Sequence, residues 1–140
     1  MAQVRADVQA KLDLTLSILE RSGVRAVVLA PIPQLVYPAP ACLASREASR
    51  CDVARALNDT LLADVTAALA EVVSRHRNAR LVQVIDFFCD AQTCHAMRDG
   101  KILYHDDDHL TITGARELGR YLNTDLAWLR VKADAAVGVK

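Results

Sequence analysis

Two short apolar runs, each set between longer helical patterns, most constrain how this chain can fold. Residues 24–30 are rich in β-branched and aliphatic side chains, and their near-continuous hydrophobicity is typical of a buried parallel strand. Residues 81–86 form a second strand-like run. An amphipathic helical pattern over residues 4–21, which Ser22 and Gly23 are expected to end, precedes the first run. The order helix, strand, helix, strand, helix predicts an α/β fold with a parallel sheet and right-handed crossovers.

Apolar stripes define the inward faces of the three predicted helices. The second helix is expected to begin at a cap formed by Asn58 or Asp59 and to run to about His76, and the third to extend from Thr113 to about Leu129. The positions expected to face inward are Val4, Val8, Leu12, Leu14, Leu16, Ile18 and Leu19, then Leu61, Leu62, Val65, Leu69, Val72 and Val73, then Leu118, Tyr121, Leu122 and Leu126. Two strands alone would leave both edges of the sheet bare.

The remaining segments are predicted to be loops or short extended pieces. All four prolines lie within residues 31–42, which makes that loop irregular but stiff. Residues 45–55 are polar and form either loop or a helical turn, whereas residues 87–100 form the loop after the second strand. Residues 102–104 are expected to be extended, and the tail over residues 131–140 to be frayed. Because parallel strands end on one rim, both strand-end loops should open on that rim.

Composition excludes several functional classes. The chain of 140 residues fits one domain, and its 17 basic and 17 acidic residues give no electrostatic case for binding nucleic acid or an anionic membrane. No apolar run approaches the roughly 20 residues that a transmembrane helix needs. The N-terminal residues mix charges into a helical pattern, unlike a signal peptide. On its own, this polypeptide is expected to stay in the cytoplasm.

The four cysteines point to a different compartment. Cys42 and Cys51 flank one loop, and Cys89 and Cys94 flank another, so two local disulfides are predicted. Disulfides imply an oxidising environment. Free thiols or a zinc site are the alternatives, although the tight Cys-x-x-Cys pair usual in zinc sites is absent.

An acid and an imidazole three positions apart carry the chemical signal of the chain. Asp106 and His109 lie in the run YHDDDHLT directly before a predicted helix start, and such a pair can form the acid and base of a hydrolytic triad. The side chains of Asp107 and Asp108 are expected to be solvated or to cap backbone N–H groups. His105 and His109 could bind a divalent metal with the aspartates between them, but their spacing converges only on a helix and this segment is predicted as loop.

Other side chains have less specific interpretations. Phe87 and Phe88 either line a pocket or pack into the core, whereas Tyr104 and Trp128 are expected to pack. Surface positions are expected for the histidines without a motif, His76 and His95.

Three segments in this order, VVLAPIPQLVYPAPACL, LVQVIDFFCDAQTC and GKILYHDDDHLTITGARELGRYL, resemble the C-terminal half of SGNH-hydrolase-like domains. The resemblance is strongest to the extracytoplasmic SGNH domain fused to bacterial integral-membrane O-acyltransferases of cell-surface polysaccharides. It implies the C-terminal half of a flavodoxin-like, three-layer parallel sheet, here over residues 1–130. It also implies that Asp106 is the orienting acid and His109 the general base.

The serine nucleophile of that family lies in a Gly-Asp-Ser block, which none of the serines in this sequence matches. The chain therefore resembles a fragment of an O-acyltransferase or esterase, periplasmic as part of a parent membrane protein, and nearly inactive alone. The implied partners are an acyl donor, a glycan hydroxyl acceptor, the missing N-terminal half and a membrane acyltransferase domain. No cofactor, metal or nucleic acid is implied. The alternative is a non-catalytic α/β module that binds carbohydrate or a partner chain.

Overall fold

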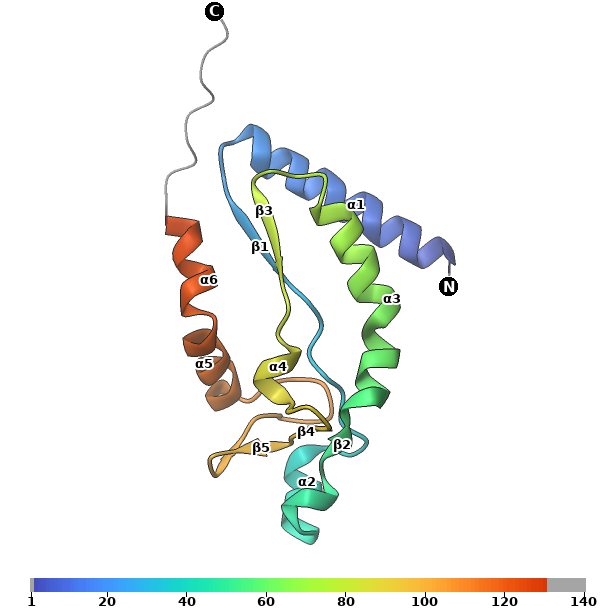
Figure 1. Cartoon of the computed structure of the whole chain (residues 1–140), viewed down its shortest axis with the longest axis vertical. Coiled ribbons are helices and arrows are strands. Elements are labelled where there is room, and N and C mark those ends of the chain that lie inside the picture. The colour runs from blue at the N-terminus through green and yellow to red at the C-terminus, as the bar shows by residue number, and fades with distance from the viewer. Residues whose placement is uncertain (1, 131–140) are drawn as a thin grey trace, which may run out of the picture. The chain divides into compact units, whose positions relative to one another are not determined.

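The computed structural model describes residues 2–130, which form short strands among longer helices (Figure 1). The helices are α1 (Ala2–Arg21), α2 (Ala39–Ser45), α3 (Arg55–Val73), α4 (Ile85–Phe88), α5 (Ile112–Tyr121) and α6 (Asn123–Ala127). The strands are β1 (Ala26–Leu29), β2 (Val53–Ala54), β3 (Ala79–Val82), β4 (Thr93–Cys94), β5 (Met97–Arg98) and β6 (Lys101–Ile102). Short 3-10 helices cover Ala48–Arg50 and Trp128–Arg130. The predicted α/β class is confirmed, whereas the three-layer arrangement and the domain bounds 1–130 stay predictions.

The described chain forms two compact units. The first unit contains residues 2–30, 64–82 and 123–130, and the second contains residues 31–63 and 83–122. The expected frayed tail over residues 131–140 lies outside the described residues. Among residues 2–130, no helix combines the length and the apolar character that a bilayer span requires.

The parallel pairing of β1 with β3 organises the first unit. The strands pair in register from Ala26 opposite Ala79 to Leu29 opposite Val82, which confirms the predicted parallel sheet. Leu16 of α1 forms a buried cluster with Val72 and Val73 of α3. The side chains packed against this cluster are Leu12, Leu19, Ala26, Val28, Ala79 and Leu81. Alternate residues of each strand therefore face the helices, as the period of two requires.

The end of α1 is set by Gly23, as predicted. Gly23 has a φ of 69°, and its N–H donates to Glu20 O at 3.0 Å while Val24 N–H donates to Leu19 O at 2.9 Å. This pair of bonds is the Schellman motif. The motif needs one residue in the left-handed backbone conformation, which glycine adopts at little energetic cost.

Several predictions for the first unit are wrong. The second strand lies at Ala79–Val82 rather than 81–86, because pairing with β1 fixes its register and the chain turns into α4 directly afterwards. Ala26, Val27 and Val28 of β1 are only partly buried and Leu29 is exposed, because among the described residues this sheet has two strands. The apolar stripe of α1 is narrower than expected, since Val8, Leu14 and Ile18 are exposed.

His76 is buried rather than on the surface, because two carboxylates hold it. Its Nδ1 lies 3.3 Å from Glu20 Oε2, and its Nε2 lies 3.1 Å from Asp13 Oδ1. Trp128 packs as expected: the Arg25 and Arg80 guanidinium groups lie 4.9 Å and 4.3 Å from its ring centroid.

The second unit is held by two disulfides and short antiparallel pairings. Cys42 is bonded to Cys51 and Cys89 to Cys94, which confirms both predicted disulfides. β2 pairs with β4, and β5 pairs with β6. The β5–β6 hairpin turns through Asp99 and Gly100, whose φ values of 49° and 73° identify the type I′ turn that this dipeptide favours. Residues 87–100 are therefore not one continuous loop.

Helix bounds in the second unit also differ from the predictions. The Pro-rich loop ends early, because Pro38 occupies the N-cap of α2. α3 begins at Arg55, so Asn58 lies inside the helix and is buried, whereas Leu61 is exposed. Val65, farther along α3 in the first unit, is also exposed.

The predicted third helix is interrupted. α5 ends at Tyr121, and the chain resumes a helix only at α6. Leu118 and Leu122 are buried as expected, whereas Tyr121 is 48% exposed. The aromatic core of this unit consists of Phe87, Phe88 and Tyr104, whose rings lie 4.8 to 5.5 Å from a neighbouring ring.

Candidate active site

The run that contains Asp106 and His109 forms a closed loop in the second unit. Tyr104 and Leu110 form an isolated antiparallel bridge at its base, and the His105 N–H donates to His109 O at 2.7 Å. Outside the bridge, the Thr111 N–H donates to Leu103 O at 2.9 Å. These bonds fix both ends of the loop, so the side chains between them are presented from a defined backbone.

A helix cap anchors the C-terminal end of this loop. The Thr111 hydroxyl accepts a hydrogen bond from the Gly114 N–H at 2.8 Å, as an N-cap does, and donates to Ile102 O at 2.9 Å. Gly114 lies so close to Leu103, the residue after β6, that a Cβ atom there would be 2.2 Å from Leu103 O. The helix expected to start at Thr113 thus begins at Ile112 after an N-cap at Thr111, and the glycine permits close contact between α5 and the backbone of Leu103.

The Asp106 carboxylate is fixed by backbone amides of its own loop. Its Oδ1 accepts from Asp108 N–H at 3.0 Å and from His109 N–H at 2.7 Å. These backbone bonds, together with the His109 ring, stabilise the charged form and lower the pKa of Asp106 to about 2. The acid is therefore ionised at neutral pH and held in one orientation.

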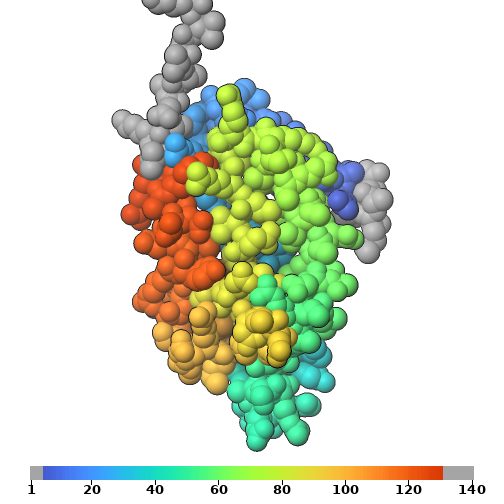
Figure 2. All heavy atoms as spheres, viewed as in Figure 1, coloured from blue at the N-terminus to red at the C-terminus, as the bar shows by residue number. Residues whose placement is uncertain are grey.

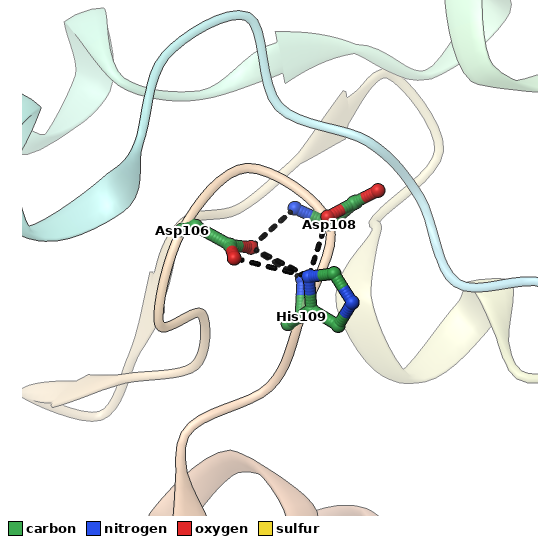
Figure 3. A group of neighbouring side chains, drawn as sticks. All are labelled: Asp106, Asp108 and His109. Carbon is green, nitrogen blue, oxygen red and sulfur yellow. Dashed lines mark hydrogen bonds and ion pairs between the residues drawn. The ribbon is translucent and has the colours of Figure 1, made fainter.

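The structure brings His109 and Asp106 together, as the spacing predicts. The His109 Nδ1 lies 3.0 Å from Asp106 Oδ2 and 3.2 Å from Asp106 Oδ1. Nδ1 also lies 2.7 Å from Asp108 Oδ1, so Asp108 is a contact of the imidazole and not only a solvated side chain. Figure 3 shows both carboxylates on the Nδ1 side of the ring, while the other ring nitrogen points away from them.

Asp106 has the larger effect on the imidazole, although Asp108 is closer. The hydrogen bond and the charge of Asp106, followed by the charge of Asp108, raise the pKa of His109. Two backbone amides also hold the Asp106 carboxylate in place. The His109 side chain is 74% exposed, so water screens this pair.

The arrangement is chemically suited to general-base catalysis. Since carboxylates surround Nδ1, that nitrogen carries the proton, and Nε2 has the lone pair that can accept another. Among residues 5–130, the side chains that form hydrogen bonds or ion pairs with the His109 ring are Asp106 and Asp108, and no serine hydroxyl is among them.

A strap of the Pro-rich segment supports the backbone of this loop. The Leu35 N–H donates to Asp107 O at 2.9 Å, and the Ala39 N–H donates to Asp106 O at 3.0 Å. The strap is itself held by Asn58, which is 1% exposed: its Oδ1 accepts from Gln34 N–H at 2.8 Å and its Nδ2 donates to Gln34 O at 3.1 Å. Sequence reasoning missed Asn58, because an asparagine near a helix start predicts a cap and gives no sign of a distant backbone partner.

Three side chains of the loop could also hold a metal ion. One ligand atom each from Asp106, Asp108 and His109 lies within 4.8 Å of the others. His105, which the sequence paired with His109 for this purpose, is not in the group, because the segment is a loop and not a helix.

A second histidine in this unit is also paired. His95 Nδ1 lies 2.8 Å from Asp52 Oδ2, and Nε2 lies 3.2 Å from Asp90 Oδ2. Burial lowers the pKa of His95, but the bonds to Asp52 and Asp90 outweigh it, and the net pKa is raised. His95 is therefore not a free surface residue. Since carboxylates occupy both ring nitrogens, it connects two disulfide loops and lacks a nitrogen for catalysis.

Comparison with known protein families identifies the family of this chain. The family model described as "SGNH domain (fused to AT3 domains)" matches residues 2–124. Neither a curated protein nor a solved structure is detectably similar to the chain. The family match covers nearly all of the described residues and includes the Asp106–His109 loop and both disulfides. The chain therefore belongs to the family of SGNH domains that are fused to AT3 domains.

Proposed function

We propose that this chain supplies the acid and base of an SGNH-type O-acyltransferase or esterase that acts on cell-surface glycans. Asp106 is the orienting acid and His109 the general base. The observation that carries the proposal is the His109 ring, whose Nδ1 is held by an ionised Asp106 while Nε2 points away from both carboxylates (Figure 3). This is the division of roles that a serine hydrolase requires of its imidazole.

The nucleophile comes from a part of the parent domain that this sequence does not contain. In the proposed step, His109 Nε2 takes the proton of a serine hydroxyl as the serine oxygen bonds to the acyl carbon of the donor. The imidazolium, stabilised by Asp106, then gives this proton to the leaving group. In the second half, Nε2 takes a proton from a sugar hydroxyl or from water, whose oxygen attacks the acyl carbon. The imidazolium returns this proton to the serine oxygen as the bond between that oxygen and the acyl carbon breaks.

The proposed setting is extracytoplasmic, in a parent protein with a membrane acyltransferase domain. Two disulfides in a domain of this size support an oxidising compartment. The family description, with its fusion to AT3 domains, supports a role linked to acyl transfer. The proposed full sheet is the three-layer, flavodoxin-like one, to which β1 and β3 contribute two strands.

Ester hydrolysis in matched chains tests the proposal. The DNA upstream of the first codon is read for an in-frame Gly-Asp-Ser block, and the longer chain is assayed with p-nitrophenyl acetate beside the present one. We expect the longer chain to be active, His109→Ala to reduce kcat about 10⁴-fold or more, and the present chain to show only background hydrolysis. His105→Ala is the matched control, because His105 lies in the same loop but outside the pair. Activity that survives His109→Ala would refute the assigned base.

A non-catalytic binding module is the second candidate. The specific observation in its favour is the two-stranded sheet of β1 and β3, each of which has an outer edge without a strand neighbour among the described residues. Such edges can pair with another chain. A stable dimer or hetero-complex without esterase activity, measured by size-exclusion chromatography with mass detection, would favour this module.

A further inference from the structure

A cavity of about 330 Å³ lies in the second unit between the β5–β6 hairpin and α5. The side chains that line it include Phe87, Arg98, Lys101, Glu117, Arg120 and Tyr121. In Figure 2 the hairpin, in gold, adjoins α5, in darker orange, on the face shown. The volume is at the lower end of the range for small-molecule sites and is sufficient for one sugar ring with its substituents.

The cations of this cavity outnumber its acids. Lys101 Nζ lies 2.7 Å from Glu117 Oε1, and the Arg120 guanidinium bonds to the same oxygen. One carboxylate thus serves two cations, and the bond from Lys101, followed by that from Arg120, lowers the pKa of Glu117. Arg98 and Asp99 complete the charged lining, so three cations face two acids and one positive charge is left over.

Two aromatic rings give the cavity an apolar wall. The Phe87 and Tyr121 centroids are 5.4 Å apart, and the Arg98 guanidinium lies 5.3 Å from the Phe87 centroid. Arg98 is also fixed by donating to Phe87 O at 2.7 Å. Tyr121 was predicted to face the core, but its side chain lines this cavity and is half exposed. A ring with both an apolar face and hydroxyl groups fits such a wall, as sugars do.

We propose that this cavity binds a sugar unit that carries a carboxylate, such as a uronic acid of the glycan substrate. The glycan part of this inference rests on the proposed function. The ligand carboxylate bonds to Lys101 and Arg120, the sugar face lies on Tyr121, and sugar hydroxyls donate to Glu117 or Asp99. A dianionic phosphate fits less well, because two acids lie on the same lining and only one positive charge is uncompensated.

Binding of a matched ligand pair to the full chain tests this site. Methyl β-D-glucuronide and methyl β-D-glucoside differ only in the carboxylate, and NMR amide shifts report the affinity of each. We expect saturable shifts in the hairpin and α5 with the glucuronide and at least fivefold weaker binding of the glucoside. Arg120→Gln should weaken glucuronide binding about fivefold to tenfold, and Glu117→Gln should strengthen it by freeing two cations.

Three controls separate this site from general attraction of anions. Arg116→Gln removes the same charge from an exposed position of α5 outside the cavity and should leave the affinity unchanged. Tyr121→Ala should weaken glucuronide binding but not acetate binding. Equal binding of the two glycosides, equal effects of Arg116→Gln and Arg120→Gln, or no saturable shift would overturn the proposal. His109→Ala should leave binding intact, so failure of this site and failure of the assigned base are distinguishable.

Discussion

The contact between Gly114 and Leu103, the residue after β6, gives the sharpest test of how this fold builds its candidate active site. An alanine at this position would place its Cβ 2.2 Å from Leu103 O and 3.0 Å from Leu103 C. Ordinary contact begins at 3.4 Å, so α5 and the strand end would have to separate by about 1.2 Å. Both obstructing atoms belong to the backbone, and no side-chain rotation can relieve the overlap.

The expected cost follows from the bonds that this separation strains. Leu103 O accepts from Thr111 N–H at 2.9 Å and from the Thr111 hydroxyl at 3.3 Å, and weakening such bonds costs about 1 kcal/mol each. Overpacking adds about 1 to 3 kcal/mol. The higher helix propensity of alanine returns about 1 kcal/mol. We therefore expect Gly114→Ala to lower the free energy of unfolding by about 2 to 4 kcal/mol.

Gly119 provides a matched control in the same helix. A Cβ at Gly119 would meet no atom within 4 Å, so Gly119→Ala should raise the free energy of unfolding by about 0.5 to 1 kcal/mol. Urea unfolding of both variants, followed by circular dichroism, measures the difference. If Gly114→Ala is as stable as Gly119→Ala, the close contact between α5 and the strand end does not exist in solution and the reasoning fails.

Four further results are expected. Asp106→Asn should bring the pKa of His109 down toward its ordinary value of 6.5 in an NMR titration, and an unchanged value would contradict the pairing. In the wild-type chain, the stabilisation from the raised pKa of His109 is present below pH 6.5 and is lost as pH rises through the raised value. The stabilisation from Asp106 is present above pH 3.8 and is lost as pH falls through about 2. Asn58→Ala should lower the free energy of unfolding by about 1 to 3 kcal/mol, because backbone groups of the strap lose their partners. Asp59→Ala, at an exposed position of the same helix, should lower it by under 1 kcal/mol. Equal losses of the two variants in urea unfolding would argue against the strap. A thiol assay on the denatured, unreduced protein should find no free thiol, and a count of four would reject both disulfides.

The sequence by itself determined the features that depend on neighbouring residues. Periodicity predicted α1, Gly23 predicted its end, and spacing predicted both disulfides and the closeness of Asp106 to His109. Each of these follows from contacts a few residues apart, where backbone geometry limits the possible arrangements. The family resemblance rested on the same short segments, and the family match confirmed it.

Only the tertiary structure decided the features that join distant segments. The register of β3 depends on β1, 53 residues earlier, and the burial of Asn58 depends on the backbone of Gln34. The tertiary structure also decided which aspartates of the loop contact the His109 ring, because a run of three identical residues does not specify which carboxylates reach it. Periodicity gives the direction of a side chain from its own element, but its partner depends on how the elements pack. For that reason the pairing of Asp106 with His109 could be predicted from the sequence, whereas the strap that supports their loop and the charged cavity beside α5 could not.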